Sequence, residues 1–156
     1  MLSKTVDQWL AEYGESHQNR TNKLIHWICV PIIFWCVLAL LWPISLASHP
    51  WINAASAVIV ISVWFYARLS WTLMLGMGSI TALSVGLIMA YERAGHALPL
   101  WGLALILFVL AWIGQFIGHK IEGKKPSFFQ DIQFLLIGPA WLLSFVYRRL
   151  GIPVRN

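Results

Sequence analysis

Three long stretches without a charged side chain dominate this sequence. Asp, Glu, Lys and Arg do not occur in residues 24–67, 69–91 and 94–119. A helix needs about 20 apolar residues to cross a bilayer, so each stretch can hold at least one crossing. The chain of 156 residues is 59% hydrophobic and 11% charged, whereas soluble domains carry about 25% charged residues. The sequence therefore predicts an integral membrane protein with a single domain, residues 1–156.

The apolar stretches divide into four predicted membrane-spanning helices. Spanning segments are expected to be helical, because a helix satisfies its backbone N–H and C=O groups within the segment. Clusters of Ser, Gly, His and Pro between the apolar runs mark turns. The predicted spans are residues 24–46, 51–69, 71–91 and 100–121.

Two shorter segments flank the predicted spans. Residues 5–16 carry apolar side chains at helical spacing, which predicts an amphipathic helix in the membrane interface. Residues 132–147 are apolar but short, and Gly138-Pro139 interrupts them. We predict a re-entrant or interfacial hairpin there. The predicted fold class is thus all-α, a polytopic membrane helix bundle.

The distribution of basic residues predicts the orientation of the chain. Lys and Arg precede the first predicted span, lie at the end of the second and follow the fourth, whereas Arg93, beside Glu92, is the single basic residue on the other side. Basic residues collect on the cytoplasmic side, so both termini are predicted to be cytoplasmic. The membrane would be the bacterial inner membrane, or the endoplasmic reticulum in a eukaryote. The net charge of +5 fits this bias and contact with anionic lipids, and we expect no nucleic-acid binding.

The predicted topology separates the five histidines into two groups. His17, His26 and His119 fall at the cytoplasmic end of the bundle, and His49 and His96 at the opposite end. A neutral imidazole offers one lone pair to a metal, so three converging rings would make a transition-metal site. His17 and His26 are nine residues apart, which places them on opposite faces of a continuous helix. Their convergence requires a helix break in the polar segment between them.

Polar residues share helix faces with two of these histidines. Asn22 precedes His26 by four residues, and Gln115 and Glu122 lie four and three residues from His119. Polar side chains on membrane helices face the bundle interior, because contact with lipid costs about 3 kcal/mol or more. Glu122 is therefore a candidate fourth ligand or base, and Asn22 and Gln115 are candidate supporting hydrogen-bonders. Two alternatives stay open: interfacial histidines can be structural hydrogen-bonded groups, and Glu122 can pair with a nearby lysine.

These residues form part of a longer spaced pattern. It reads Tyr13-x-x-x-His17-x-x-x-x-Asn22-x-x-x-His26-x-x-x-x-Pro31, then Trp112-x-x-Gln115-x-x-Gly118-His119-x-x-Glu122-x-x-x-Pro126, then Gly138-Pro139. From Tyr13 to about Tyr147, the chain resembles the family of the yeast 2-hydroxy fatty acid dioxygenase. The resemblance implies an Fe(II)-dependent membrane enzyme that converts a 2-hydroxy long-chain fatty acid and O2 to the acid one carbon shorter, with loss of CO2.

We therefore predict an iron-dependent dioxygenase with His17, His26 and His119 as metal ligands. Its partners would be a 2-hydroxy fatty acid, O2 and membrane lipids. Three imidazoles leave coordination positions open for a substrate carboxylate and hydroxyl and for O2. An alternative from another class is a non-enzymatic membrane protein that binds lipid or acts as a scaffold, with structural histidines. A small transporter is a further alternative, opposed by spans without midplane charges and by a sequence without a repeat.

Overall fold

The computed structural model of the chain describes residues 4–49, 51–126 and 133–154. In these residues every regular element is an α-helix, and one isolated bridge joins Ser45 to Asn53. The all-α prediction is confirmed. The helices are α1 (Val6–Glu15), α2 (Arg20–Leu41), α3 (Ala54–Leu69), α4 (Trp71–Ala94), α5 (Leu100–Glu122) and α6 (Phe134–Leu150).

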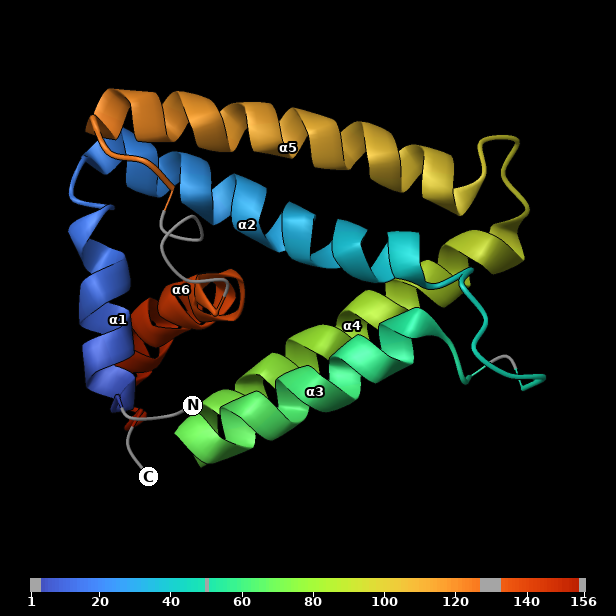
Figure 1. Cartoon of the computed structure of the whole chain (residues 1–156), viewed down its shortest axis with the longest axis horizontal. Helices are drawn as coiled ribbons and strands as arrows, with labels where there is room; N and C mark the ends of the chain where they lie inside the picture. The colour runs from blue at the N-terminus through green and yellow to red at the C-terminus, as the bar shows by residue number, and fades with distance from the viewer. Residues whose placement is uncertain (1–3, 50, 127–132, 155–156) are drawn as a thin grey trace.

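Two antiparallel helix pairs make up most of the molecule (Figure 1). In the first pair, α5 packs along α2, and two glycines of α5 allow the close approach. A Cβ atom at Gly114 would lie 2.7 Å from the Cys29 sulfur, and one at Gly118 would overlap the side-chain oxygen of Asn22. In the second pair, α3 and α4 are joined through Ser70, whose hydroxyl accepts from the Leu73 backbone N–H and caps α4.

The remaining helices, α1 and α6, lie at one end of the α2–α5 pair (Figure 1). The buried face of α1 presents Val6, Trp9 and Tyr13, as the predicted amphipathic pattern requires. Trp9 meets Phe134 of α6 edge-on, with ring centroids 5.3 Å apart. This packing brings the C-terminal end of α1 beside the first turn of α2.

Among the described residues, three helices are long and apolar enough to cross a membrane: Arg20–Leu41, Trp71–Arg93 and Leu100–Glu122. The chain is a membrane protein, as predicted. The apolar helix α3 has 16 residues, which corresponds to about 24 Å, shorter than the hydrocarbon core of about 30 Å. The predicted number of four spans is therefore not confirmed.

Local capping and proline chemistry account for the boundaries that differ from prediction. α2 begins at Arg20 rather than at residue 24, because the Asn19 side chain accepts from the N–H groups of Thr21 and Asn22. It ends at Leu41 rather than at residue 46, since Pro43 has no backbone N–H to donate to the Ala39 carbonyl and so cannot continue the helix.

The C-terminal segment forms one helix, and the predicted hairpin over residues 132–147 is wrong for the described residues from 133 onward. α6 continues through Gly138 and Pro139. The proline removes one backbone donor, but burial of Ile137 and Trp141 holds the helix in place. Gly138 lets Tyr13 pack closely, since a Cβ atom there would lie 2.9 Å from the phenol oxygen.

Candidate metal centre

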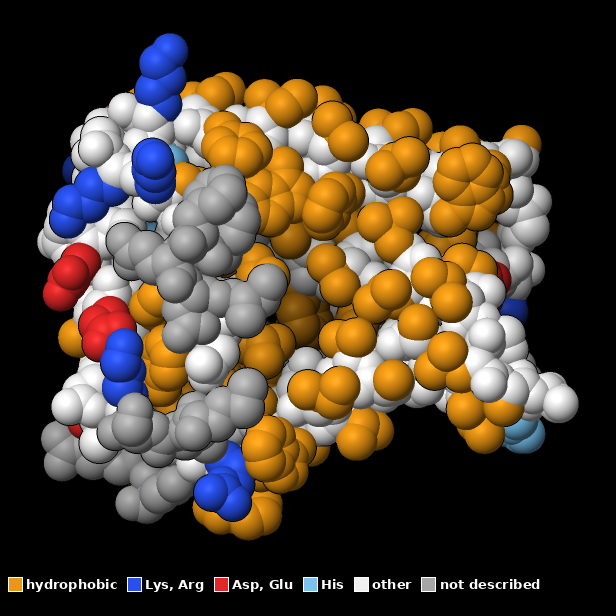
Figure 2. All heavy atoms as spheres, in the orientation of Figure 1, with side chains coloured by type: hydrophobic (Ala, Val, Ile, Leu, Met, Phe, Trp, Pro, Cys, Tyr) orange, Lys and Arg blue, Asp and Glu red, His pale blue; other side chains and the backbone are white. Residues whose placement is uncertain are grey.

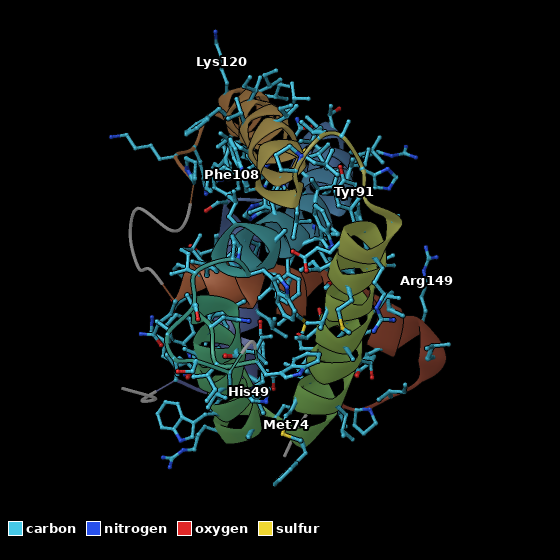
Figure 3. All side chains as sticks on the ribbon, turned by 90° about the vertical axis from the view of Figure 1, so that its right-hand side faces the viewer. His49, Met74, Tyr91, Phe108, Lys120 and Arg149 are labelled. Carbon is cyan, nitrogen blue, oxygen red and sulfur yellow. The ribbon has the colours of Figure 1, made fainter. Side chains whose placement is uncertain are left out.

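His17, His26 and His119 converge in the structure, as predicted from the topology. One ligand atom from each ring lies within 4.8 Å of the other two. The Nε2 atoms of His17 and His26 are 2.9 Å apart, and the side chains are 0%, 1% and 4% exposed. His49 and His96 are exposed on other loops. Figure 3 shows that the side chain of Lys120, the residue after His119, points away from the bundle.

A break between α1 and α2 brings His17 to His26, as the sequence required. α1 ends at Glu15, and α2 starts four residues after Ser16, at Arg20. The intervening turn changes the direction of the chain, and His17 packs edge-on against His26 with ring centroids 4.2 Å apart. Tyr13, one turn earlier in α1, stacks on His17 at 4.2 Å.

Backbone carbonyls determine which nitrogen of two rings carries the proton. His17 Nδ1 lies 2.6 Å from the Tyr13 carbonyl oxygen, and His26 Nδ1 lies 2.9 Å from that of Asn22. A carbonyl only accepts hydrogen bonds, so in a neutral ring Nδ1 carries the proton and Nε2 keeps a lone pair. Both lone pairs then face each other across 2.9 Å. Two acceptors at that distance repel each other, and a cation bound by both would relieve the repulsion.

The third ring contributes a nitrogen that lacks a partner. His119 Nδ1 is buried and makes no hydrogen bond to any described residue. A buried ring nitrogen without a partner is costly, and a metal ion at this position would satisfy it. The donor set of three imidazoles is one that iron, copper, zinc and nickel accept. The residues present therefore fit a transition-metal ion.

Burial keeps the first of these histidines neutral. Desolvation, followed by the neighbouring His26, lowers the pKa of His17 to about 3. Desolvation also raises the pKa of the stacked Tyr13 phenol above its ordinary value. At neutral pH His17 is thus an uncharged ring, the form that binds metals.

Glu122, the candidate fourth ligand or base, contacts the turn that carries His17. Its Oε1 accepts from the Gln18 backbone N–H at 2.8 Å. Its Oε2 accepts from the Asn19 backbone N–H at 2.9 Å and from Asn22 Nδ2 at 3.0 Å. Both oxygens are thus engaged by N–H groups, and the converging ligand atoms come from the three histidines.

The two candidate supporting residues lie on either side of the histidines. Asn22 is buried and also donates to the Ser16 carbonyl at 3.2 Å, which ties α2 to the end of α1. Gln115 is 6% exposed and lies beside His26 and Cys29. Its Nε2 makes no hydrogen bond within the described part of the chain. This amide is therefore available to a bound molecule.

An apolar groove of about 410 Å³ starts at this cluster. Tyr13, Gln115 and His119 line one end, and residues of α2, α3, α4, α5 and α6 line the remainder. Figure 2 shows the surface hollowed at this place, with hydrophobic side chains around it. Sequence reasoning missed the groove, because its walls come from segments far apart in the chain and no local motif marks them.

Comparison with known proteins places these features in a family. The profile of the 2-hydroxy-palmitic acid dioxygenase Mpo1-like family matches residues 3–150. The 2-hydroxy-palmitic acid dioxygenase MPO1 of Saccharomyces cerevisiae is 28% identical over 157 residues, which cover 91% of this chain and 79% of that protein. The putative manganese efflux pump MntP of Crocosphaera subtropica is 38% identical over 69 residues, 42% of this chain and 37% of that protein.

No solved structure matches the chain. The family profile spans all of the described helices, and its match includes the three buried histidines and the residues that position them. The chain belongs to the 2-hydroxy-palmitic acid dioxygenase Mpo1-like family.

Proposed function

We propose that this protein is an Fe(II)-dependent dioxygenase that shortens 2-hydroxy long-chain fatty acids by one carbon. One 2-hydroxy acid and one O2 balance to the shortened acid, CO2 and one water, so the reaction needs no further reductant. Membership of the Mpo1-like family supports the reaction class. The observation that carries the metal assignment is the pair of facing Nε2 atoms of His17 and His26, 2.9 Å apart, beside the unpartnered Nδ1 of His119.

The three histidines would hold the iron. Bound Fe(II) would supply the one-electron chemistry by which O2 reacts with an organic acid. The Tyr13 and Asn22 carbonyls hold the Nδ1 protons of His17 and His26, which directs both Nε2 lone pairs to the same point. Burial of all three rings excludes bulk water from the site.

Gln115, Asn22 and Glu122 would assist in two different ways. The unpartnered Nε2 of Gln115 can donate to the carboxylate or hydroxyl of a substrate in the groove. Glu122 and Asn22 would act as positioning residues, because their hydrogen bonds hold the turn on which His17 lies. Glu122 as a fourth ligand is less favourable, since ligation would take an oxygen from these N–H groups.

The proposed arrangement in the membrane keeps α3 as a fourth span, with local thinning of the bilayer because this helix is short. Lys and Arg side chains gather where α1, the start of α2 and the end of α5 meet (Figure 2). This end would be cytoplasmic by the excess of basic residues. The chain would form a single membrane domain, with α1 lying in the interface.

Oxygen uptake by the iron-loaded protein tests the proposed reaction. Purified protein is supplied with 2-hydroxypalmitic acid, and O2 consumption and CO2 release are followed together. We expect both with the hydroxy acid and neither with palmitic acid, which lacks the hydroxyl. A metal-loaded protein that consumes no O2 with any 2-hydroxy acid would overturn the enzyme assignment and favour lipid binding without catalysis.

A further inference from the structure

The groove beside the histidines is polar at one end only. Ser62 and Thr81 also line it, but their hydroxyls donate to the Val58 and Met77 carbonyls of their own helices. They therefore present little polarity to the groove. Its volume of about 410 Å³ falls in the range of small-molecule sites, about 300–1,000 Å³.

The groove follows the axis of the α2–α5 pair away from the metal centre. On α5 its lining runs from His119 to Phe108, which corresponds to about 16 Å of helix rise. On α2 it runs from Val30 to Leu38. Because α3 is antiparallel to α2, Val58 near the start of α3 lies at the end of the groove that is remote from the histidines (Figure 1).

A buried polar atom at the histidine end of the groove lacks a partner. Gln115 Nε2 makes no hydrogen bond to the described residues, although its side chain is over nine-tenths buried, and His119, which also lines this end, is a proposed iron ligand. A ligand that suits both ends must have one polar head and one hydrocarbon tail. A single-chain fatty acid has this chemistry.

We propose that the groove is the acyl-chain channel, with the substrate head at Gln115 and His119 and the methyl end at Val58, Leu38 and Phe108. The inference rests on the proposed function, because it places the tail of that substrate. The residues at the remote end then set the longest chain that fits. Val58 is the specificity-determining residue that can be enlarged with least disturbance, since it is only half-buried.

A matched pair of substitutions tests the channel. Val58→Phe adds a ring at the remote end, whereas Val60→Phe adds the same ring two residues later on α3, at a side chain that is 68% exposed. Binding is measured by displacement of radiolabelled 2-hydroxypalmitic acid from the full-length protein in detergent, with 2-hydroxy acids and unsubstituted fatty acids of decreasing chain length. Iron content and Tm are measured on each variant.

We expect Val58→Phe to weaken binding of the longest acids by about tenfold, a typical effect of overfilling a packed site. Binding of short acids and iron content should stay unchanged. Val60→Phe should match the wild type at every chain length. Phe108→Ala, which enlarges the same end, should shift the preference toward longer acids.

Identical chain-length profiles for Val58→Phe and wild type would overturn the channel, and so would failure of the wild type to bind any fatty acid. The proposed function is tested separately by O2 uptake. If the protein consumes O2 but Val58→Phe leaves the chain-length profile of binding unchanged, the reaction is supported and the channel is not. If Val58→Phe alters the chain-length profile for unsubstituted acids but the protein consumes no O2, the channel is supported and the proposed reaction is not.

Discussion

At the scale of single residues, the site depends on where two imidazole protons lie. The Tyr13 and Asn22 carbonyls are each four residues before the histidine they contact. Helix geometry brings the Asn22 carbonyl to His26 within α2, whereas the turn after Glu15 brings His17 to the Tyr13 carbonyl. Both Nε2 lone pairs are left facing each other in a buried space. Binding of a cation by both nitrogen atoms would remove the repulsion between these lone pairs.

Acid should destabilise the metal-free protein through His17. Its pKa is lowered to about 3 in the folded chain and is about 6.5 in an unfolded one. The unfolded state therefore binds more protons between these values, and stability falls as pH falls from about 6.5 toward 3. We expect His17→Gln to reduce the pH dependence of urea unfolding below pH 6.5, and His49→Gln, at an exposed site, to leave it unchanged. Equal slopes for wild type and His17→Gln would contradict this.

Glu122→Gln should weaken metal binding without changing the ligand set. The amide keeps one acceptor oxygen but turns N–H donors toward groups that themselves donate, namely the Asn19 N–H or Asn22 Nδ2. We expect metal affinity to fall by about tenfold, as for other residues that orient a ligand. Glu92→Gln, which alters the carboxylate beside Trp42, is the matched control.

The absorption spectrum of bound Co(II) separates a positioning role from ligation. It should keep its shape in Glu122→Gln, because the three imidazoles remain. A changed spectrum at saturating Co(II) would show that Glu122 is itself a ligand.

At the scale of helices, the sequence predicted the elements better than their ends or their continuity. Apolar runs and the pattern of α1 identified the helices, because those signals are local. The start of α2 depends on Asn19 as a cap, and the continuity of α6 through Pro139 depends on packing against distant side chains such as Tyr13. Such tertiary contacts leave no mark on the local sequence.

The α2–α5 contact should be sensitive to one methyl group. Gly118→Ala places a Cβ atom against the Asn22 side-chain oxygen, one residue before His119, whereas Gly78→Ala meets nothing within 4 Å. We expect Gly118→Ala to lower stability by about 1–3 kcal/mol and to weaken metal binding. Gly78→Ala should leave both unchanged or raise stability slightly, since alanine favours helix. A Gly118→Ala protein with wild-type Tm and metal affinity would contradict the packing described here.

At the scale of the whole molecule, the histidine cluster followed from topology, whereas the groove did not. The predicted even number of crossings between His26 and His119 places both residues at one end of the bundle. The groove needs the relative placement of α2, α3, α5 and α6, which composition and periodicity do not determine. The position of Glu122 was likewise only partly predictable. Its spacing from His119 was visible in the sequence, but its contact with the turn that carries His17 was not.

The proposed four-span arrangement makes a sidedness prediction. A cysteine introduced at Lys120 should react with a membrane-impermeant thiol reagent from the cytoplasmic side, and one at His49 from the opposite side. Both positions are exposed, and the native Cys29 and Cys36 are buried. Labelling of both cysteines from the same side would contradict the proposal that α3 and α4 both cross the membrane.

The most direct test of the central claim is elemental analysis of detergent-purified protein prepared without oxygen, wild type beside His119→Ala. The account predicts iron in the wild type and its loss in the variant, with Tm measured on both to confirm folding. A different metal in the wild type would keep the site but contradict the iron assignment. Equal iron in both proteins, or none in either after Fe(II) is added, would contradict the histidine metal centre itself.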